Sequence, residues 1–236
     1  MLSIIIPTLN EEKYLPLLLG SIKKQDFFDY EIIVSDAGSE DKTLEIAQKY
    51  GCKIVRGGFV STGRNNGAKA ARGDIFLFLD ADVILPPFFL KNSVEKFKKR
   101  NLGIAAFLIF PQSSKKIYKV CFKFFNLYVW LVQKLSAHSV AAIMVKREIH
   151  QTIGGFDEEI FFVEDYSYTR EAAKVSKFGL IKEPFFVSVR RYEKDGRFNV
   201  CVKYALAELH VLFLGPVKSD IFKYRFGHYE NKEAKK

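Results

Sequence analysis

Two aspartates separated by a single residue close an apolar run in this chain of 236 residues. Residues 76–85 read FLFLDADVIL, with Gly-Asp before them and Pro-Pro after them, which predicts a short buried strand with Asp80 and Asp82 at its end. Because an unpartnered buried charge costs several kcal/mol, the pair requires a cation. Two hard oxygen ligands suit Mg²⁺ or Mn²⁺ bridging substrate phosphates. A simple strand-end turn is the alternative, although a turn needs only one aspartate.

A second polar segment, SDAGSEDKT at residues 35–43, follows another predicted strand. The strand ends in Asp36, and a Gly-Ser turn leads to a helix N-terminus. A carboxylate in this position can hold a nucleotide base or ribose by hydrogen bonds. An ordinary β-to-α turn with caps is the alternative interpretation.

The third segment, residues 154–179, begins with a Gly-Gly turn and carries adjacent acidic residues, Glu164 and Asp165, at a predicted helix start. Acidic residues in a first helical turn often only complement the helix dipole. Farther along, Arg190 and Arg191 could contact a donor or acceptor phosphate, and paired arginines on a surface strand are the alternative.

The first hundred residues alternate predicted strands with predicted helices. Strands are predicted at 2–7, 30–36, 52–57 and 74–80, and helices at 11–24, 41–50, 62–72 and 88–100. This alternation predicts an α/β fold with a mostly parallel sheet and helices on both faces. Ligands bind beyond the carboxyl ends of such strands, where Asn10, Asp36 and the Asp80/Asp82 pair would lie.

The second half is rich in aromatic residues and predicts two long helices with narrow polar stripes. The stripe of residues 117–135 consists of Lys119, Lys123, Asn126, Gln133 and Lys134, and that of 198–214 of Asn199, Lys203 and His210. A wide apolar face is usually core. The alternative is contact with a bilayer interface, with Tyr128 and Trp130 near the headgroups.

Charge and cysteine content limit the functional classes. The 37 Lys and Arg exceed the 27 Asp and Glu by 10, which favours an anionic partner such as a nucleotide, a phospholipid surface or a nucleic acid. Three scattered cysteines without a C-x-x-C pair predict neither a disulfide framework nor a zinc knuckle, and fit a reducing cytosol. No basic leader and no run of roughly 18 uncharged apolar residues is present, so we expect no signal peptide and no transmembrane helix.

Taken together, four segments resemble, in order and spacing, the inverting glycosyltransferases of family 2, which have the GT-A fold. The segments are LSIIIPTLNEEKYLPLLLGSI, EIIVSDAGSEDKT, GRNNGAKAARGDIFLFLDADV and GGFDE…VEDYSYTR. The resemblance covers roughly residues 2–192. It implies a Rossmann-like sheet flanked by helices, with Arg64 beside the nucleotide, Asp80 and Asp82 at the metal, and Asp165 as base. The nucleotide-binding positions that it implies are Thr8, Asn10, Glu11 and Asp36.

Two departures from the family pattern narrow the expected activity. Ile84 stands where some polyprenyl-phosphate-sugar synthases carry a polar residue, so the metal would have fewer side-chain ligands. The Q-x-x-R-W motif of processive members is missing, and SVRRYEKDG at 188–196 occupies that region instead. Processive polymer synthesis is therefore not expected.

The domain expectation follows from these motifs. Residues 1–192 should form the GT-A domain, with a nucleotide-sugar half at about 1–100 and an acceptor half at about 101–192. Residues 193–236 should form a C-terminal amphipathic helix and basic tail packed on the same domain.

The expected function is metal-dependent, inverting sugar transfer from a nucleotide-sugar donor. UDP is mildly preferred, since Asp36 suits uracil. The acceptor would be lipid-linked or a polyprenyl phosphate, reached by peripheral membrane contact from the cytosolic side, and no nucleic acid is expected.

Two other classes compete with this interpretation. A haloacid-type phosphatase carries a D-x-D, but near the N-terminus and followed by Thr or Val where this chain has Ile84. A basic non-catalytic module that binds nucleotides or nucleic acid would explain the net charge. However, no zinc knuckle or RNA-binding aromatic motif is present, and the basic residues are scattered.

Overall fold

The computed structural model describes residues 1–133 and 136–222. Within them, eight strands form one sheet with the order β3-β2-β1-β4-β7-β6-β8-β5. The strands are β1 (Leu2–Thr8), β2 (Tyr30–Asp36), β3 (Lys53–Arg56), β4 (Ile75–Leu79), β5 (Val83–Ile84), β6 (Ile104–Pro111), β7 (Ala142–Lys146) and β8 (Phe178–Val187). The helices are α1 (Leu15–Lys23), α2 (Thr43–Lys49), α3 (Val60–Ala70), α4 (Phe89–Lys99), α5 (Lys116–Val132), α6 (Arg147–Thr152), α7 (Glu164–Val175), α8 (Arg190–Lys194) and α9 (Arg197–Phe213), with a 3₁₀ turn at Asp220–Phe222.

The sheet is parallel in its first half and mixed in its second. Strand β1 pairs in parallel with β2 and β4, and β2 with β3. Beyond β4, β7 runs antiparallel to both of its neighbours, β6 and β8 are parallel, and β5 is antiparallel to β8. The prediction of a mostly parallel sheet therefore holds for four of seven pairings. The antiparallel strand β7 follows α5, in the half of the chain where strands and helices do not alternate regularly in sequence, so no local pattern predicted its direction.

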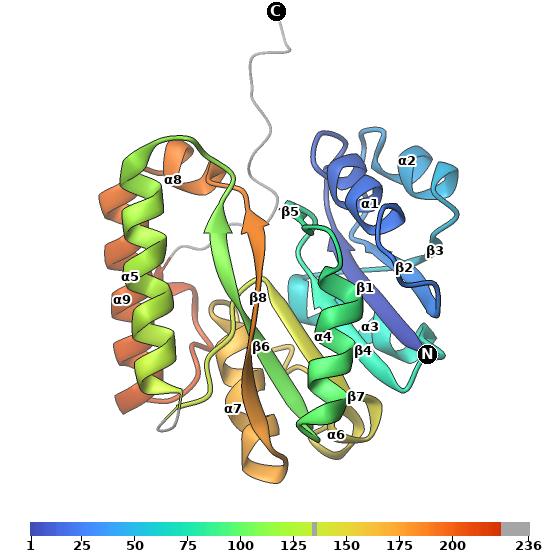
Figure 1. Cartoon of the computed structure of the whole chain (residues 1–236). Coiled ribbons are helices and arrows are strands. Elements are labelled where there is room, and N and C mark those ends of the chain that lie inside the picture. The colour runs from blue at the N-terminus through green and yellow to red at the C-terminus, as the bar shows by residue number, and fades with distance from the viewer. Residues whose placement is uncertain (134–135, 223–236) are drawn as a thin grey trace, which may run out of the picture.

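Alternating apolar residues of the strands build a core on each face of the sheet. Ile4 and Ile6 pack with α1 and α4 on one face, whereas Ile5 packs on the other face with residues of α3 and α7. This division follows from the two-residue period of a strand, which directs successive side chains to opposite faces. Helices therefore cover both faces, as predicted (Figure 1).

The predicted strand over residues 76–85 is interrupted. Strand β4 ends at Leu79, residues 80–82 turn, and Val83–Ile84 form the separate strand β5, which pairs with β8 at the far edge of the sheet. The prediction of one continuous strand over residues 76–85 was therefore wrong, because the chain leaves the sheet at the turn that contains the two aspartates. Their predicted place at the end of a strand is confirmed for Asp80.

The four predicted helices of the first half are confirmed as α1 to α4, with shifted ends. Helix α1 begins at Leu15 and not at Glu11, because the chain turns first: Asn10 has a φ of 55° and residues 12–14 form a turn. Proline at the second position of α1 fits a helix start, where no amide donor is needed. This turn places the buried Glu11 beyond the carboxyl end of β1.

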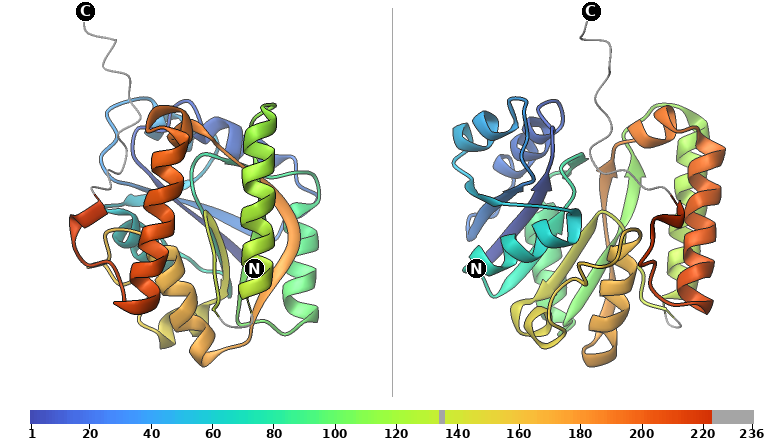
Figure 2. Two further views of the ribbon diagram at one scale, coloured as in Figure 1. Left: turned by 90° about the vertical axis from the view of Figure 1, so that its left-hand side faces the viewer. Right: turned by 180° about the vertical axis from the view of Figure 1, so that it is seen from behind.

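Helices α5 and α9 stand side by side at one side of the sheet (Figure 2). Helix α5 lies on β6, where the Asn126 side chain donates to the carbonyl of Ile109 and accepts from its amide. Asn126 therefore faces the sheet and not the solvent, which corrects the predicted polar stripe. Lys134 and the predicted basic tail at residues 227–236 lie outside the described residues. Among the described helices, none combines the length and apolar character needed to span a bilayer.

Candidate active site

The Asp80/Asp82 turn faces a cavity of about 510 Å³ beyond the carboxyl ends of β1 and β4. Helices α5, α8 and α9 and the segment before α7 contribute the other walls. Five of the eight predicted site residues line this cavity, and they come from four separate parts of the sequence: Glu11, Arg64, Asp80, Asp82 and Asp165. The fold thus brings the metal candidates and the candidate base to one cavity.

Arg64, on α3, connects three carboxylates in this cavity. Its side chain is only 2% exposed, and its guanidinium lies 2.9 Å from Asp80 Oδ1, 2.9 Å from Glu164 Oε1 and 2.5 Å from Asp165 Oδ1. Burial disfavours its charge, but the three carboxylates outweigh burial and raise the pKa of Arg64 above its usual range. Arg64 therefore stays cationic and fixes the acidic groups relative to one another.

The segment before α7 is held against α3 by the residue next to Arg64. The Asn65 amide donates to the carbonyl of Phe156 and accepts from its amide at 2.9 and 2.8 Å. Gly155 has a φ of 84°, and a Cβ at this position would lie 2.6 Å from Asn65 Oδ1. The predicted Gly-Gly turn thus permits a close approach that places Phe156 over the Arg64 guanidinium, 5.1 Å from its ring centroid.

Asp165 lies in the first turn of α7, as predicted, and its side chain is 15% exposed. Its Oδ2 accepts a hydrogen bond of 3.2 Å from the amide of Ala141. Burial raises the pKa of Asp165 above its usual range. Arg64 opposes this shift, whereas the nearby charges of Glu164 and Asp80 add to it. A carboxylate with a raised pKa that faces a cavity is suited to accept a proton near neutral pH.

Asp82 and Glu11 share a second arginine, Arg190 of α8. Arg190 donates to both oxygens of Glu11 at 2.8 and 2.6 Å, and its Nε lies 3.0 Å from Asp82 Oδ2. Its guanidinium also stacks 4.4 Å from the Tyr14 ring centroid. Burial raises the pKa of Glu11 to about 7 against the opposing effect of Arg190, and burial likewise raises the pKa of Asp82.

The other three predicted residues form a neighbouring cluster at the ends of β1 and β2. Thr8 donates to Asp36 Oδ2 at 2.9 Å, and Asp36 also accepts from the amides of Gly38 and Ser39 and from the Ser39 hydroxyl. Asn10 accepts from the amide of Glu40. Asp36 therefore organises its own turn, as the alternative interpretation held, and its contact with a nucleotide stays a prediction.

The oxygen atoms of Asp80 and Asp82 are of the kind that binds a divalent cation, but two carboxylates are too few to complete its coordination. Asp80 and Asp82 supply hard oxygens at one cavity, and their arginine pairs engage Oδ1 of Asp80 and Oδ2 of Asp82. In the described part of the chain, no group of three or more His, Cys, Asp or Glu side chains could hold a metal. A cation at this pair would therefore need further oxygens, which donor phosphates and water supply in Mg²⁺ sites.

The sequence singled out Glu164 beside Asp165 and predicted a possible phosphate contact for Arg190, but it did not predict their ion pairs. Glu164 binds Arg64 directly, and Arg190 lies on the short helix α8 and not on a strand. The signals that singled them out are local, since Glu164 adjoins Asp165 and Arg190 follows the last strand. Tyr128, Tyr204 and Glu208 also line the cavity, but no sequence signal indicated this. They lie on α5 and α9, and the sequence does not show which side of these helices faces the cavity.

The open mixed sheet flanked by helices, with acidic residues at the carboxyl ends of its strands, has the arrangement of the GT-A fold, as its likeness to solved glycosyltransferases shows. The profile described as "Glycosyl transferase family 2" matches residues 3–154, and this chain belongs to that family. Family membership argues against both the phosphatase and the non-catalytic alternative.

Three similar proteins illustrate the relationship. The Staphylococcus aureus poly(ribitol-phosphate) beta-N-acetylglucosaminyltransferase TarS is 38% identical over 101 residues, 39% of this chain and 18% of TarS. A Methanococcus voltae transferase, named for a dolichyl N-acetyl-alpha-D-glucosaminyl phosphate, is 36% identical over 112 residues, 42% of this chain and 34% of its own length. The crystal structure of the Pyrobaculum calidifontis mannosyltransferase PcManGT with GDP-Man and Mn²⁺ has a TM-score of 0.71 at 19% identity, covering 90% of this chain and 64% of that one. The chain thus spans only part of each of these proteins.

Proposed function

We propose that this chain catalyses metal-dependent, inverting transfer of a sugar from a nucleotide-sugar donor, with UDP mildly preferred, to a lipid-linked or polyprenyl phosphate acceptor. The observation that carries the proposal is the Arg64 cluster, in which a single guanidinium contacts both Asp80 and Asp165. The candidate base, Asp165, and a candidate metal ligand, Asp80, are therefore separated only by the guanidinium group that contacts both of them. Donor phosphates and acceptor oxygen would then meet in the same cavity.

The donor half of the site is assigned to the carboxyl ends of the parallel strands. Asp36, with Thr8 and Asn10 beside it, would face the nucleoside, and Glu11 and Arg64 would lie beside the diphosphate. Asp80 and Asp82 would hold Mg²⁺ or Mn²⁺, which neutralises charge on a departing nucleoside diphosphate. The similarity to a structure that contains GDP-Man and Mn²⁺ supports a site of this kind.

Asp165 is assigned the acceptor half of the reaction. For a hydroxyl acceptor, its carboxylate accepts the proton as the oxygen attacks the anomeric carbon from the face opposite the leaving group, which inverts that carbon. A phosphate acceptor is already largely ionised near neutral pH, and Asp165 would then orient it. Arg64 holds the carboxylate in place for either role.

Asp82→Asn is expected to abolish metal-dependent transfer while the fold stays intact, because the cation loses one of two protein carboxylates. The variant should also need a much higher Mn²⁺ concentration to bind nucleoside diphosphate in a thermal-shift titration. Asp26→Asn is the matched control, since Asp26 pairs with Lys91 on the surface. Full activity of Asp82→Asn in chelator-treated buffer would contradict the metal role.

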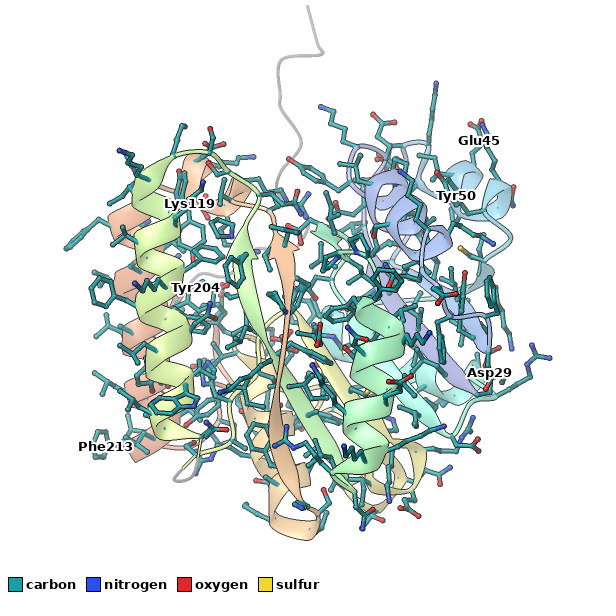
Figure 3. All side chains as sticks on the ribbon, viewed as in Figure 1. Asp29, Glu45, Tyr50, Lys119, Tyr204 and Phe213 are labelled. Atoms are coloured by element: carbon teal, nitrogen blue, oxygen red, sulfur yellow. The ribbon has the colours of Figure 1, made fainter. Side chains whose placement is uncertain are left out.

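The acceptor proposal rests on the outward side of α5 and α9. We define the outer apolar face by its exposed members Val120, Phe124, Leu127 and Leu131 of α5 and Phe198, Leu206, Leu209 and Phe213 of α9. Phe213 projects away from the body of the protein, on the side opposite Asp29 (Figure 3). An exposed apolar patch over two helices, with the basic Lys119 and Lys123 on α5, suits the interface of an anionic bilayer. The enzyme would then act at the cytosolic face of a membrane.

Sedimentation with phosphatidylglycerol vesicles tests this contact. The chain is expected to sediment at low salt and less at high salt, because both apolar burial and screened charge contribute. The double variant F124D/F213D should remain in the supernatant. Phe28→Asp is the matched control, because Phe28 is 84% exposed but lies between α1 and β2. If the unmodified chain stays in the supernatant at both salt concentrations, the membrane proposal is wrong.

A further inference from the structure

The active-site cavity changes character between its two sides. Its charged side carries the carboxylates and arginines described above. Its other side, which we call the apolar chamber, lies between strands β6 and β8 and helices α5 and α9. The chamber is lined chiefly by Ile109, Phe122, Phe125, Phe162, Val187 and Tyr204. The charged side is assigned to the nucleotide sugar, whereas the apolar chamber has no assigned ligand.

Two hydroxyl groups beside the chamber already have protein partners. The Tyr128 hydroxyl donates to Glu208, and the hydroxyl of Tyr166 lies 2.7 Å from Ser136 Oγ. His138 is packed among aromatic rings, and burial lowers its pKa to about 4, so it is neutral. Ring faces and aliphatic groups therefore dominate this surface. A sugar placed against these rings would need partners for several hydroxyl groups, whereas an alkyl chain needs none.

The chamber begins next to the candidate base. Val163 and Tyr166 flank the Glu164–Asp165 pair in sequence, and both line the same cavity, as does Arg191 beside Arg190. An oxygen that reaches Asp165 therefore lies in the same cavity as the apolar chamber, so that an alkyl chain joined directly to this oxygen would enter the chamber.

We propose that the apolar chamber binds the linear apolar chain of an acceptor whose nucleophilic oxygen is joined directly to that chain, as a phosphate monoester or as an alcohol. This inference rests on the proposed sugar transfer and specifies its acceptor. It separates such an acceptor from a lipid-linked saccharide, in which the nucleophile is a sugar hydroxyl remote from the lipid. The chamber then recognises the chain itself, in addition to any membrane that presents it.

Two native cysteines provide a test that does not depend on catalysis. Cys121 of α5 and Cys201 of α9 both line the cavity, whereas Cys52 lies outside it, between α2 and β3. Dodecyl phosphate, used below its micelle concentration at ten times its Kd, is expected to slow alkylation of Cys121 and Cys201 by N-ethylmaleimide about tenfold. The rate at Cys52 should not change. Peptide mass spectrometry reads each site separately.

Probes of different structure identify the head group. Ethyl phosphate, which has almost no chain, and dodecyl maltoside, which interposes a sugar, should both protect weakly. Stronger protection by dodecyl phosphate than by dodecanol assigns a phosphate head, and equal protection assigns an alcohol. Protection by ethyl phosphate or dodecyl maltoside equal to that by dodecyl phosphate would overturn the proposal, as would no protection at all.

A matched pair of variants on α9 locates the effect. Ala205 lines the chamber, whereas its neighbour Leu206 belongs to the outer apolar face. Ala205→Phe should remove the protection by dodecyl phosphate while nucleoside diphosphate binding stays unchanged, and Leu206→Phe should retain it. Protection that survives Ala205→Phe would place the chain elsewhere and contradict the proposal. Since no step requires sugar transfer, failure here is distinct from failure of the proposed activity.

Discussion

With a hydroxyl acceptor, Asp165→Asn is expected to lower turnover by about 10² to 10⁴ with little change in donor affinity, as for the loss of a general base. Asparagine has nearly the same shape as aspartate but cannot accept the acceptor's proton. The donor contacts assigned to Asp36, Glu11 and the metal pair do not involve this side chain. Steady-state kinetics and nucleotide titration measure the two quantities independently.

The pH dependence of kcat should also identify Asp165 as the base. Asp165 must be ionised to act as base, so kcat should rise as pH increases through its pKa in the folded protein. Because burial raises that pKa, the rise is expected above the range of an ordinary aspartate. In Asp165→Asn this acidic limb should disappear from the residual activity.

Glu164→Gln is the matched control for this prediction. Glu164 also binds Arg64 and also lines the cavity, but it is assigned a supporting role. Its replacement should reduce kcat much less and leave the acidic limb in place. Near-normal turnover of Asp165→Asn, or an equal loss in both variants, would reject Asp165 as the base.

Arg64→Met should produce the largest loss of stability in the site. The substitution removes the cation from Asp80, Glu164 and Asp165 and leaves their charges without their common partner. Removing one partner of a buried ion pair costs about 3 to 5 kcal/mol of unfolding free energy. Urea denaturation near neutral pH measures this difference directly.

The pH dependence of this loss has a defined sign. Without Arg64, which opposes the effect of burial, the folded-state pKa of Asp165 rises further, so the deficit is fully present above that pKa. It shrinks as pH falls and this carboxyl group becomes neutral. Arg72→Met is the control, because Arg72 is 75% exposed in its pair with Glu31 and should change stability by less than about 1 kcal/mol. A deficit that matches the control, or that does not vary with pH, would show that Arg64 is not the organising charge.

Local pattern was sufficient for much of the fold. Helices α1 to α4 and strands β1 to β4 follow the alternation read from residues 1–100, because hydrophobic periodicity and Gly or Pro boundaries act over a few residues. Asp36 and Asp80 lie at strand ends for the same reason. The order of the motifs also indicated the family that the profile match confirms.

The partners of the acidic residues were decided only by the tertiary structure. Arg190 binds Glu11 across 179 positions of sequence, and Arg64 binds Glu164 across 100. A sequence pattern shows that a carboxylate needs a cation, but not whether a metal or an arginine is nearest. Both aspartates of the D-x-D segment are paired with arginines that no local pattern could assign to them.

The second half of the sheet shows the same limit. The sequence itself determined the helical character of α5 and α9, the strand-end position of the carboxylates and the turn before Asp165. Only tertiary packing decided that Asn126 faces β6, that Val83–Ile84 pairs with β8, and which sides of α5 and α9 line the cavity. Periodicity fixes the faces of a helix relative to one another. Which of them is buried depends on contacts between elements distant in sequence, which are formed only when the whole chain packs.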